Sequence, residues 1–520
     1  MNLLTDPLLR VATQDGDATM SIPQLLEALG RDAVDGLAGI QRHQQDAFHV
    51  FLCCVAAAVL VRAGRDDARQ PASFWETGLR ELSAAGDDAW TLVVPDTSRP
   101  AFMQPPVPAS DRFARAGDTP DALDLLPAPK NHDVKQERAR SAALDEWVYA
   151  LVSLQTMSGF FGQGNYGISR MNGGFGNRPI VELTNSLRMG ARWQSAVARL
   201  MAHRESVLAG PWGYDPSGVV LVWEIPWDGR TALPLRALDP LYVEVCRRVR
   251  LVQASGRVEA MKLPSTSPRI GAEALHGVVG DPWLPVDTSG GKAVEAEKVL
   301  TLSAKGFTAE LLRRLVFADG FRMSALQAPA RDWRGDAWFV ASALVRGQGT
   351  TEGFHERVIP VPAGVRANLF EVGERRKALA DLARGAIEYA GVMHYRVLRP
   401  ALRAYLQADA RTGPGRDAEE AWLRQIEERF EHLWSDRLFP WLWRHANDAD
   451  LSALEQDWCL DLRDHARSVL SEAMATLPTR TGRRYQARTA ADSRFWRSLY
   501  WKDNFPFLKE EGPDGRTALR

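Results

Sequence analysis

The stretch Pro360-Val361-Pro362-Ala363-Gly364 divides the sequence into two parts with different patterns. Downstream of it, apolar residues recur at steps of three and four, as they do along one face of an amphipathic helix. These residues are Leu379, Leu382, Ala386, Ala390, Met393 and Val397. The periodicity predicts that a helical domain begins at about residue 365.

Three more helices are predicted further along, through Trp422–Leu433, Leu454–Ala473 and Tyr485–Trp501. Four helices joined by short loops bury their apolar stripes against one another as a bundle. Residues 417–431 hold six acidic residues and two arginines, whereas residues 480–502 hold seven basic residues and one aspartate. A solvated helix face is the commoner explanation of such runs, but a basic last helix could also follow a phosphate backbone.

The first 364 residues predict a mixed α/β domain. Short apolar runs at 91–94 and 219–225 predict strands, and the segments 46–61 and 142–157 predict helices. Gly and Pro recur throughout, which indicates many long loops. We therefore expect an α+β protein with three parts: a large mixed α/β domain over 1–364, a four-helix bundle over 365–505 and a C-terminal tail over 506–520.

Composition and charge exclude several classes of protein. The 520 residues include 64 Lys+Arg and 65 Asp+Glu, so the net charge of −1 excludes a domain that coats nucleic acid by itself but permits a local basic site. The four cysteines are too few for a disulfide scaffold and lack the spacing of a zinc site. The longest apolar stretch, Val50–Val61, is shorter than the roughly 20 residues of a membrane span, and the N-terminus lacks the features of a signal peptide. We expect a soluble, cytoplasmic protein with no metal, no cofactor and no membrane contact.

A search for catalytic motifs finds no His-Glu-x-x-His pair, no Gly-x-Ser-x-Gly elbow and no phosphate-binding loop with Gly-Lys-Ser/Thr. One segment stands out, the glycine-rich stretch 159–176. Its glycines Gly162, Gly164 and Gly167 match Gly-x-Gly-x-x-Gly formally. However, a helix precedes them and more glycines follow, whereas a dinucleotide site has a strand before the glycines and a helix after them.

Two interpretations of this glycine loop stay open. Its glycines could serve backbone geometry alone, since glycine adopts left-handed conformations without strain. Alternatively, the loop could lie against a DNA minor groove, where Asn165, Tyr166, Arg170 and Arg178 would bond to phosphates or base edges.

Three further features are Asn2-Leu3-Leu4-x-Asp6 at the start, Phe102-Met103-Gln104, and a strand near Pro179 that follows the glycine loop. The order and spacing of these motifs resemble the CasA family, the Cse-type large subunit of the type I-E CRISPR interference complex called Cascade. The family also ends in a four-helix bundle, so the resemblance extends over essentially the whole chain.

The resemblance implies recognition of the short motif that flanks a target (PAM), read in duplex DNA mainly from the minor groove. It also implies that a hairpin tip opens the duplex and that a loop tethers the subunit to the guide end of the complex. The implied residues are Gly162, Gln163, Gly164, Asn165 and Lys262 for the groove, Gln348 or else Thr350 or Thr351 for the tip, and Lys130, Asn131 and Lys135 for the tether.

The resemblance further implies a set of partners: the backbone, small and guide-capping subunits, CRISPR RNA, double-stranded target DNA and a nuclease-helicase. Some members of the family carry a cysteine cluster in mid-chain, where this sequence keeps only Cys246, so no zinc is expected. Because the guide RNA reads the target by base pairing, the protein needs to read only the flank and needs no catalytic residue. Two alternatives stay open: an enzyme with a dispersed active site in the α/β domain, and a purely architectural subunit.

Overall fold

The computed structural model of the chain forms two compact units, each considered by itself. The first comprises Met1–Phe307 and Ala318–Val361, and the second comprises Thr308–Phe317 and Pro362–Arg520. The second unit thus includes a short earlier segment as well as the chain from Pro362 onward. The structure describes residues 1–124, 142–174, 176–290, 297–330, 333–347, 350–370, 373–408, 416–448, 454–477, 481–501, 503–505 and 508.

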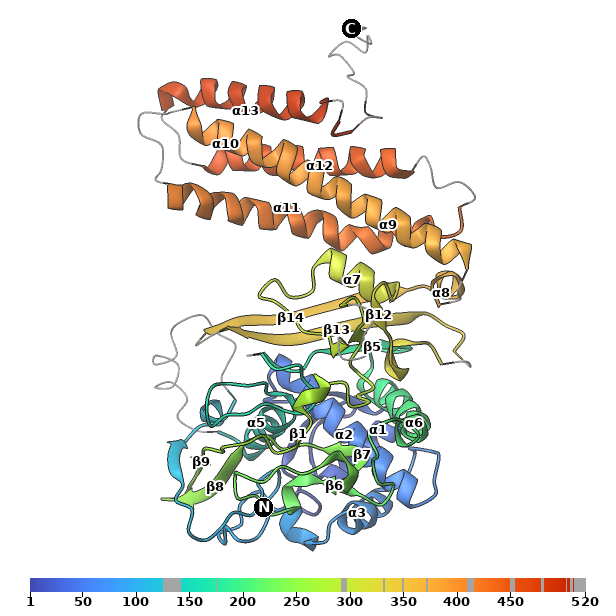
Figure 1. Ribbon diagram of the computed structural model, residues 1–520, viewed down its shortest axis with the longest axis vertical. Helices are drawn as coiled ribbons and strands as arrows, with labels where there is room; N and C mark the ends of the chain where they lie inside the picture. Colours follow the sequence, from blue (N-terminus) through green and yellow to red (C-terminus); the bar gives the residue numbers. More distant parts are fainter. Residues whose placement is uncertain are drawn as a thin grey trace. The chain divides into compact units, whose positions relative to one another are not determined.

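Helix α2 (Arg42–Arg62) is the central helix of the first unit (Figure 1). It packs against α5 (Leu144–Met157) and α6 (Met189–Leu208). It is the one helix among the described residues that is long and apolar enough to cross a membrane, and 89% of its most apolar window is buried inside the protein. A helix that is apolar on all sides is expected in a core. The helices predicted over 46–61 and 142–157 are confirmed.

The other elements of the first unit lie around this core. Three strands form the antiparallel sheet β2-β1-β3, three short ones form β11-β10-β12, and β6 pairs with β7 in parallel. The bounds are α1 Ile22–Gly30, α3 Ala72–Glu81, β1 Leu9–Thr13, β2 Gly16–Met20, β3 Val34–Leu37, β6 Val219–Leu221, β7 Leu238–Val243, β10 Val286–Asp287, β11 Lys298–Val299 and β12 Phe321–Arg322.

The two predicted strands had different outcomes. The run at 219–225 is a strand over Val219–Leu221 and then turns into a short 3-10 helix. The strand predicted at 91–94 is wrong, since Thr91 forms only a single bridge, with Asn2. The backbone there bonds to isolated partners, with Leu92 N donating to Met1 O and Phe102 N to Thr91 O, so no continuous ladder forms.

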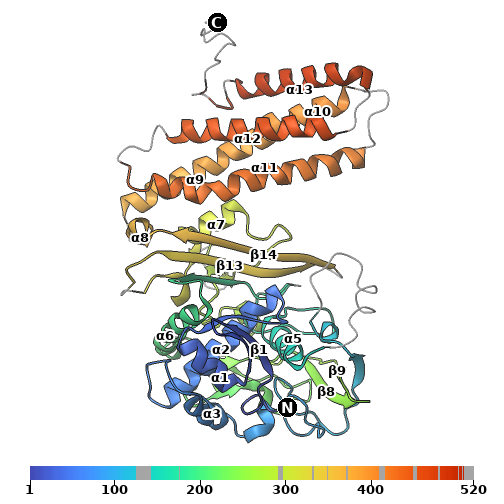
Figure 2. The same ribbon diagram turned by 180° about the vertical axis from the view of Figure 1, so that it is seen from behind.

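Two antiparallel sheets of the first unit carry Lys262, Thr350 and Thr351, three of the residues predicted to contact DNA. One has the order β4-β9-β8, and the other has the order β14-β13-β5, in which β13 and β14 form the long hairpin in Figure 2. Lys262 lies on β9, where it pairs with Val249 on one side and Ala114 on the other. The bounds are β4 Ala114–Gly117, β8 Arg248–Ala254, β9 Arg257–Leu263, β5 Ile180–Thr184, β13 Ala337–Gly347 and β14 Thr350–Val361.

The second unit contains the predicted four-helix bundle, whose helices lie side by side in Figures 1 and 2. Its first rod is α9 (Glu374–Val392), continued by a π-helical segment and by α10 (Arg399–Gln407). The others are α11 (Arg416–Arg444), α12 (Leu454–Thr476) and α13 (Arg484–Leu499). Two short helices, α7 (Ala309–Val316) and α8 (Ala363–Phe370), complete the unit. The fold class is therefore confirmed.

The first rod continues past Pro400, where an ordinary helix would break. A proline ring clashes with the carbonyl four residues earlier and offers no N–H. Here the π-helical segment Met393–Leu398 precedes it. Wider π turns accommodate such a mismatch without ending the helix.

Candidate nucleic-acid interface

The glycine loop is closed at its base by backbone hydrogen bonds between the end of α5 and the start of β5. Ser158 bridges to Asn177, and Gly159 N donates to Gly176 O at 3.0 Å. Arg178 N donates to Met157 O at 2.8 Å. The loop therefore leaves a buried helix and returns to a sheet strand, so both of its ends are fixed.

The tip of the loop is a tight turn. Phe161 N donates to Asn165 O at 2.9 Å, and Asn165 N donates to Gly162 O at 3.0 Å. Gly162 and Gly164 have φ of +94° and +89°, the left-handed region that glycine adopts without strain. A Cβ at Gly164 would lie 3.0 Å from the Cβ of Pro264, whereas one at Gly162 would meet nothing within 4 Å. Gly164 is thus held by a close approach, and Gly162 faces open space.

The loop docks on the residues that follow β9. Ser265 N donates to Gly164 O at 3.1 Å, and this contact brings the tip next to the strand that carries Lys262. Between them lies a pocket of about 300 Å³. Its lining includes Phe160, Phe161, Asn165, Asn177, Arg247 and Lys262. The structure thus brings Asn165 and Lys262, which are 97 positions apart in sequence, to the same pocket.

The five residues assigned to the groove differ in exposure. Gln163, Asn165 and Lys262 are exposed, Gly162 is half-buried and Gly164 is buried. Two polar side chains of the tip and one cation on β9 are therefore accessible to a ligand. Gly164 shapes the backbone beneath them.

Arg247 is a residue of the site that sequence reasoning missed. It is 8% exposed, and its guanidinium donates to Gly159 O at 2.8 Å and to Tyr166 O. It thereby ties together the two arms of the loop. The sequence holds no signal of this role, because the partners of Arg247 are backbone carbonyls, which every sequence provides.

The DNA interpretation of the glycine loop made Arg170 and Arg178 available to phosphates or base edges, and for these two residues it is wrong. Both are buried, at 8% and 4% exposure. Arg170 Nη1 lies 3.5 Å from a Glu244 oxygen and its Nε lies 3.4 Å from Asp281, which also pairs with Arg178. A guanidinium that is desolvated and paired with carboxylates inside the protein cannot reach DNA.

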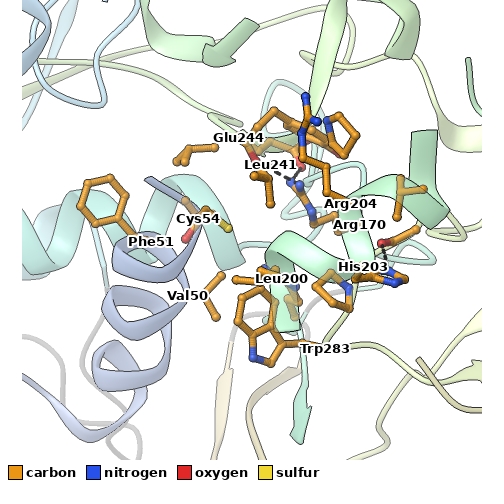
Figure 3. A pocket seen from close by; sticks show the side chains of 18 residues that line it. Val50, Phe51, Cys54, Arg170, Leu200, His203, Arg204, Leu241, Glu244 and Trp283 are labelled. Atoms are coloured by element: carbon orange, nitrogen blue, oxygen red, sulfur yellow. Dashed lines mark hydrogen bonds and ion pairs between the residues drawn. The ribbon is translucent and has the colours of Figure 1, made fainter. Parts of the chain in front are cut away.

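These ion pairs line a second pocket, shown in Figure 3, which is the strongest place to look for a dispersed active site. Its volume is about 30 Å³, enough for one or two waters and too small for a substrate. Burial raises the pKa of the Cys54 thiol to about 11 and lowers the pKa of His203, so the thiol and the imidazole are both neutral. Arg204 forms an ion pair with Asp239, in which Nη2 lies 2.6 Å from Oδ2. The pocket is a small void between buried ion pairs and apolar side chains.

The other predicted site residues fall partly outside the described residues. Lys130, Asn131, Lys135 and Gln348 lie outside them. The backbone of Thr350 pairs with Gly347, and that of Thr351 with Arg346, at the described end of the β13–β14 hairpin. Among the described residues, no group of three His, Cys, Asp or Glu side chains is placed to hold a metal ion.

Comparisons with known proteins give one consistent family. The sequence matches the profile of the family described as CRISPR-associated protein Cse1 over residues 2–469. Among curated proteins none matches. The fold is similar to CasA (Cse1) of Thermus thermophilus, with 16% identity, a TM-score of 0.62, and 96% of this chain and 99% of that one covered.

Two further solved structures agree. Cse1 of Acidimicrobium ferrooxidans is 16% identical, with a TM-score of 0.62 and coverage of 98% of this chain and 99% of that one. Cse1 of Thermobifida fusca is 14% identical, with a TM-score of 0.61 and coverage of 97% and 98%. The profile match extends over most of the chain, which confirms the resemblance seen in the sequence: this chain belongs to the Cse1 family of CRISPR-associated proteins.

Proposed function

We propose that this chain is the large subunit of a type I-E CRISPR RNA-guided surveillance complex and recognises the motif that flanks the target in duplex DNA. The observation that carries the proposal is the convergence of Asn165 and Lys262 at one pocket beside the glycine loop. A chain from a solved structure described as a CRISPR RNA-guided surveillance complex has a similar fold, at 13% identity and a TM-score of 0.56, which supports membership of such a complex.

The chemistry of these groups suits the minor groove. An A·T pair offers only acceptors there, and a G·C pair adds one donor. The ammonium of Lys262 donates, while the amide of Asn165 both donates and accepts, so the two can distinguish classes of flank without reading each base. A glycine at position 162 lets the backbone approach the groove, since nothing lies within 4 Å of where its Cβ would be.

The remaining functions belong to the same proposal. Gln348, or else Thr350 or Thr351, fills the space between separated bases and so promotes opening of the duplex. Lys130, Asn131 and Lys135 tether the subunit to the guide end of the complex. The net charge of −1 fits a subunit whose partners, the other Cascade subunits and the CRISPR RNA, provide most of the backbone contacts. In this role the chain is cytoplasmic, helps to recruit the nuclease-helicase and catalyses no reaction itself.

The test is binding of the assembled complex to duplex targets whose flank is randomised. The parent complex should select a restricted set of flanks. Lys262→Ala should weaken binding to these flanks and leave binding to unrelated DNA nearly unchanged. Lys298→Ala is the matched control, because Lys298 is also an exposed strand lysine but lies on β11, in another sheet. Equal binding to all flanks by the parent would refute the proposal.

A further inference from the structure

The pocket beside the glycine loop contains a buried acceptor that flank recognition does not use. Asn177 lines the pocket and is 6% exposed. Its Oδ1 is buried and accepts no hydrogen bond from any residue that the structure describes. Buried amide oxygens in folded proteins nearly always have a partner, so an unpaired one at a pocket wall indicates a ligand with a donor.

Part of the pocket wall is apolar and aromatic, beside polar residues such as Asn165, Arg247 and Arg248. Phe160 and Phe161 come from the loop, and Leu154 comes from α5. Phe161 is 41% exposed, although a large apolar side chain normally packs away from water. Its backbone is held in place, because its N–H closes the turn onto Asn165. The pocket of about 300 Å³ is far larger than the 10–15 Å³ that one water requires.

A flat ring with polar edges fits this set of groups. Aromatic side chains stack on the face of a nucleobase, and an Asn amide forms hydrogen bonds with its edge. Lys262, exposed where it lines the same pocket, can neutralise the phosphate attached to such a base. Aromatic side chains, an unpaired amide oxygen and an exposed lysine at one pocket together suit a single nucleotide unit.

We propose that this pocket binds one nucleobase rotated out of the DNA stack beside the flank. The inference rests on the proposed function, which brings the flanking duplex to the glycine loop. Rotation of a base is least costly where pairing is already broken, as at the first opened pairs of the target. A captured base cannot re-pair, so the pocket would help to hold the duplex open.

The test uses 2-aminopurine, whose fluorescence rises when it leaves the base stack. It is placed at one position at a time across the flank and the first pairs of the target, and each duplex is bound to the assembled complex. One position should brighten several-fold with the parent chain. Asn177→Leu and Phe161→Ala should each reduce that increase at least threefold. Leu275→Ala should not, because Leu275 is similarly exposed, at 37%, but lies outside the pocket.

Asn177→Leu should fold normally, since no hydrogen bond of its Oδ1 is lost. If no position brightens, or if both variants brighten as the parent does, the nucleobase proposal is wrong. Flank preference measured on the same samples separates this result from failure of the proposed function. Preference without brightening overturns only the pocket, whereas absence of preference in the parent overturns the function.

A free nucleotide offers the pocket the same base and phosphate as a rotated DNA base does. A second experiment distinguishes these two ligands. The 5′-monophosphate of 2-aminopurine riboside is titrated into the full chain without DNA. Saturable binding that Asn177→Leu abolishes, together with no brightening on DNA, would overturn the proposal of a rotated DNA base and indicate a site for a free nucleotide. Brightening on DNA with no saturation by the free nucleotide is the result that we expect.

Discussion

Replacing Arg247 by methionine tests how the glycine loop is held in place. Arg247 donates to Gly159 O on one arm of the loop and to Tyr166 O on the other. Methionine keeps an apolar side chain of similar length but removes every donor. The two carbonyls would then have no partner among the residues that the structure describes.

The size of the effect follows from these two bonds. A hydrogen bond from a charged donor contributes about 1.5–3 kcal/mol, so the pair sets an upper limit of roughly 3–6 kcal/mol. Gly159 and Arg247 both line the pocket, where water can enter and hydrate the freed carbonyls. We therefore expect the free energy of opening the loop to fall by about 2–4 kcal/mol.

Hydrogen exchange measures this opening directly. The amides of Phe161 and Asn165 close the turn, and their exchange should become roughly 30- to 1000-fold faster, since each 1.4 kcal/mol is a factor of about ten. Flank-selective binding by the assembled complex should weaken in parallel, because a disordered loop loses preorganisation.

Arg250→Met is the matched control. Arg250 lies on β8, three residues further along the chain, is likewise buried, and donates to the carbonyls of Val94, Asp96 and Arg99. This variant should destabilise the protein by a similar amount without changing exchange in the glycine loop. Exchange at Phe161 and Asn165 that stays as slow in Arg247→Met as in the parent would refute the reasoning.

Four further outcomes are expected. Lys262→Ala should weaken binding of the complex to flank-bearing duplex by about 1–3 kcal/mol, measured against unrelated duplex. Gly164→Val should reduce the yield of folded protein, because φ is +89° and the new Cβ would press on Pro264. Gly162→Ala should remain soluble and lower the free energy of unfolding in denaturant by roughly 1–2 kcal/mol. Burial lowers the pKa of His49 from 6.5 to about 4, so the folded state binds fewer protons than the unfolded state below pH 6.5. The free energy of unfolding should therefore fall by about 3 kcal/mol between pH 6.5 and pH 4, and acid unfolding of His49→Gln should lack this loss. Gln348→Ala should slow strand opening on linear targets and be partly rescued by negative supercoiling, and equal opening on linear targets would assign the wedge elsewhere.

The bundle could be predicted from the sequence because its signal is local. Leu379, Leu382 and Ala386 recur on one helical face, and this face is buried. The helix over 46–61 could be predicted for the same reason, and it is α2. The strand predicted at 91–94 failed because a strand needs a partner ladder, which depends on residues distant in sequence.

The site was only partly accessible to sequence reasoning. The glycines of the loop could be found because a left-handed turn requires that residue type, and both Gly162 and Gly164 have positive φ. The roles of the arginines could not, because a guanidinium looks the same in sequence whether it faces solvent or a buried carboxylate. Arg170 was assigned to a ligand and lies among Glu244 and Asp281, while Arg247 received no role and holds the loop.

The two halves of the glycine loop are held by different chemistry, and under the proposed function this difference would let a nearly neutral subunit read DNA. The second half is held by buried ion pairs of Arg170 and Arg178 with Asp281, which fix one arrangement more than they add stability. The first half is held by Arg247 through backbone carbonyls. Three cations thus serve to position the loop, and Lys262 is left exposed at the pocket. Few contacts suffice for a degenerate groove only if they are preorganised, so under the proposed function these buried pairs would contribute to recognition without contacting the DNA themselves.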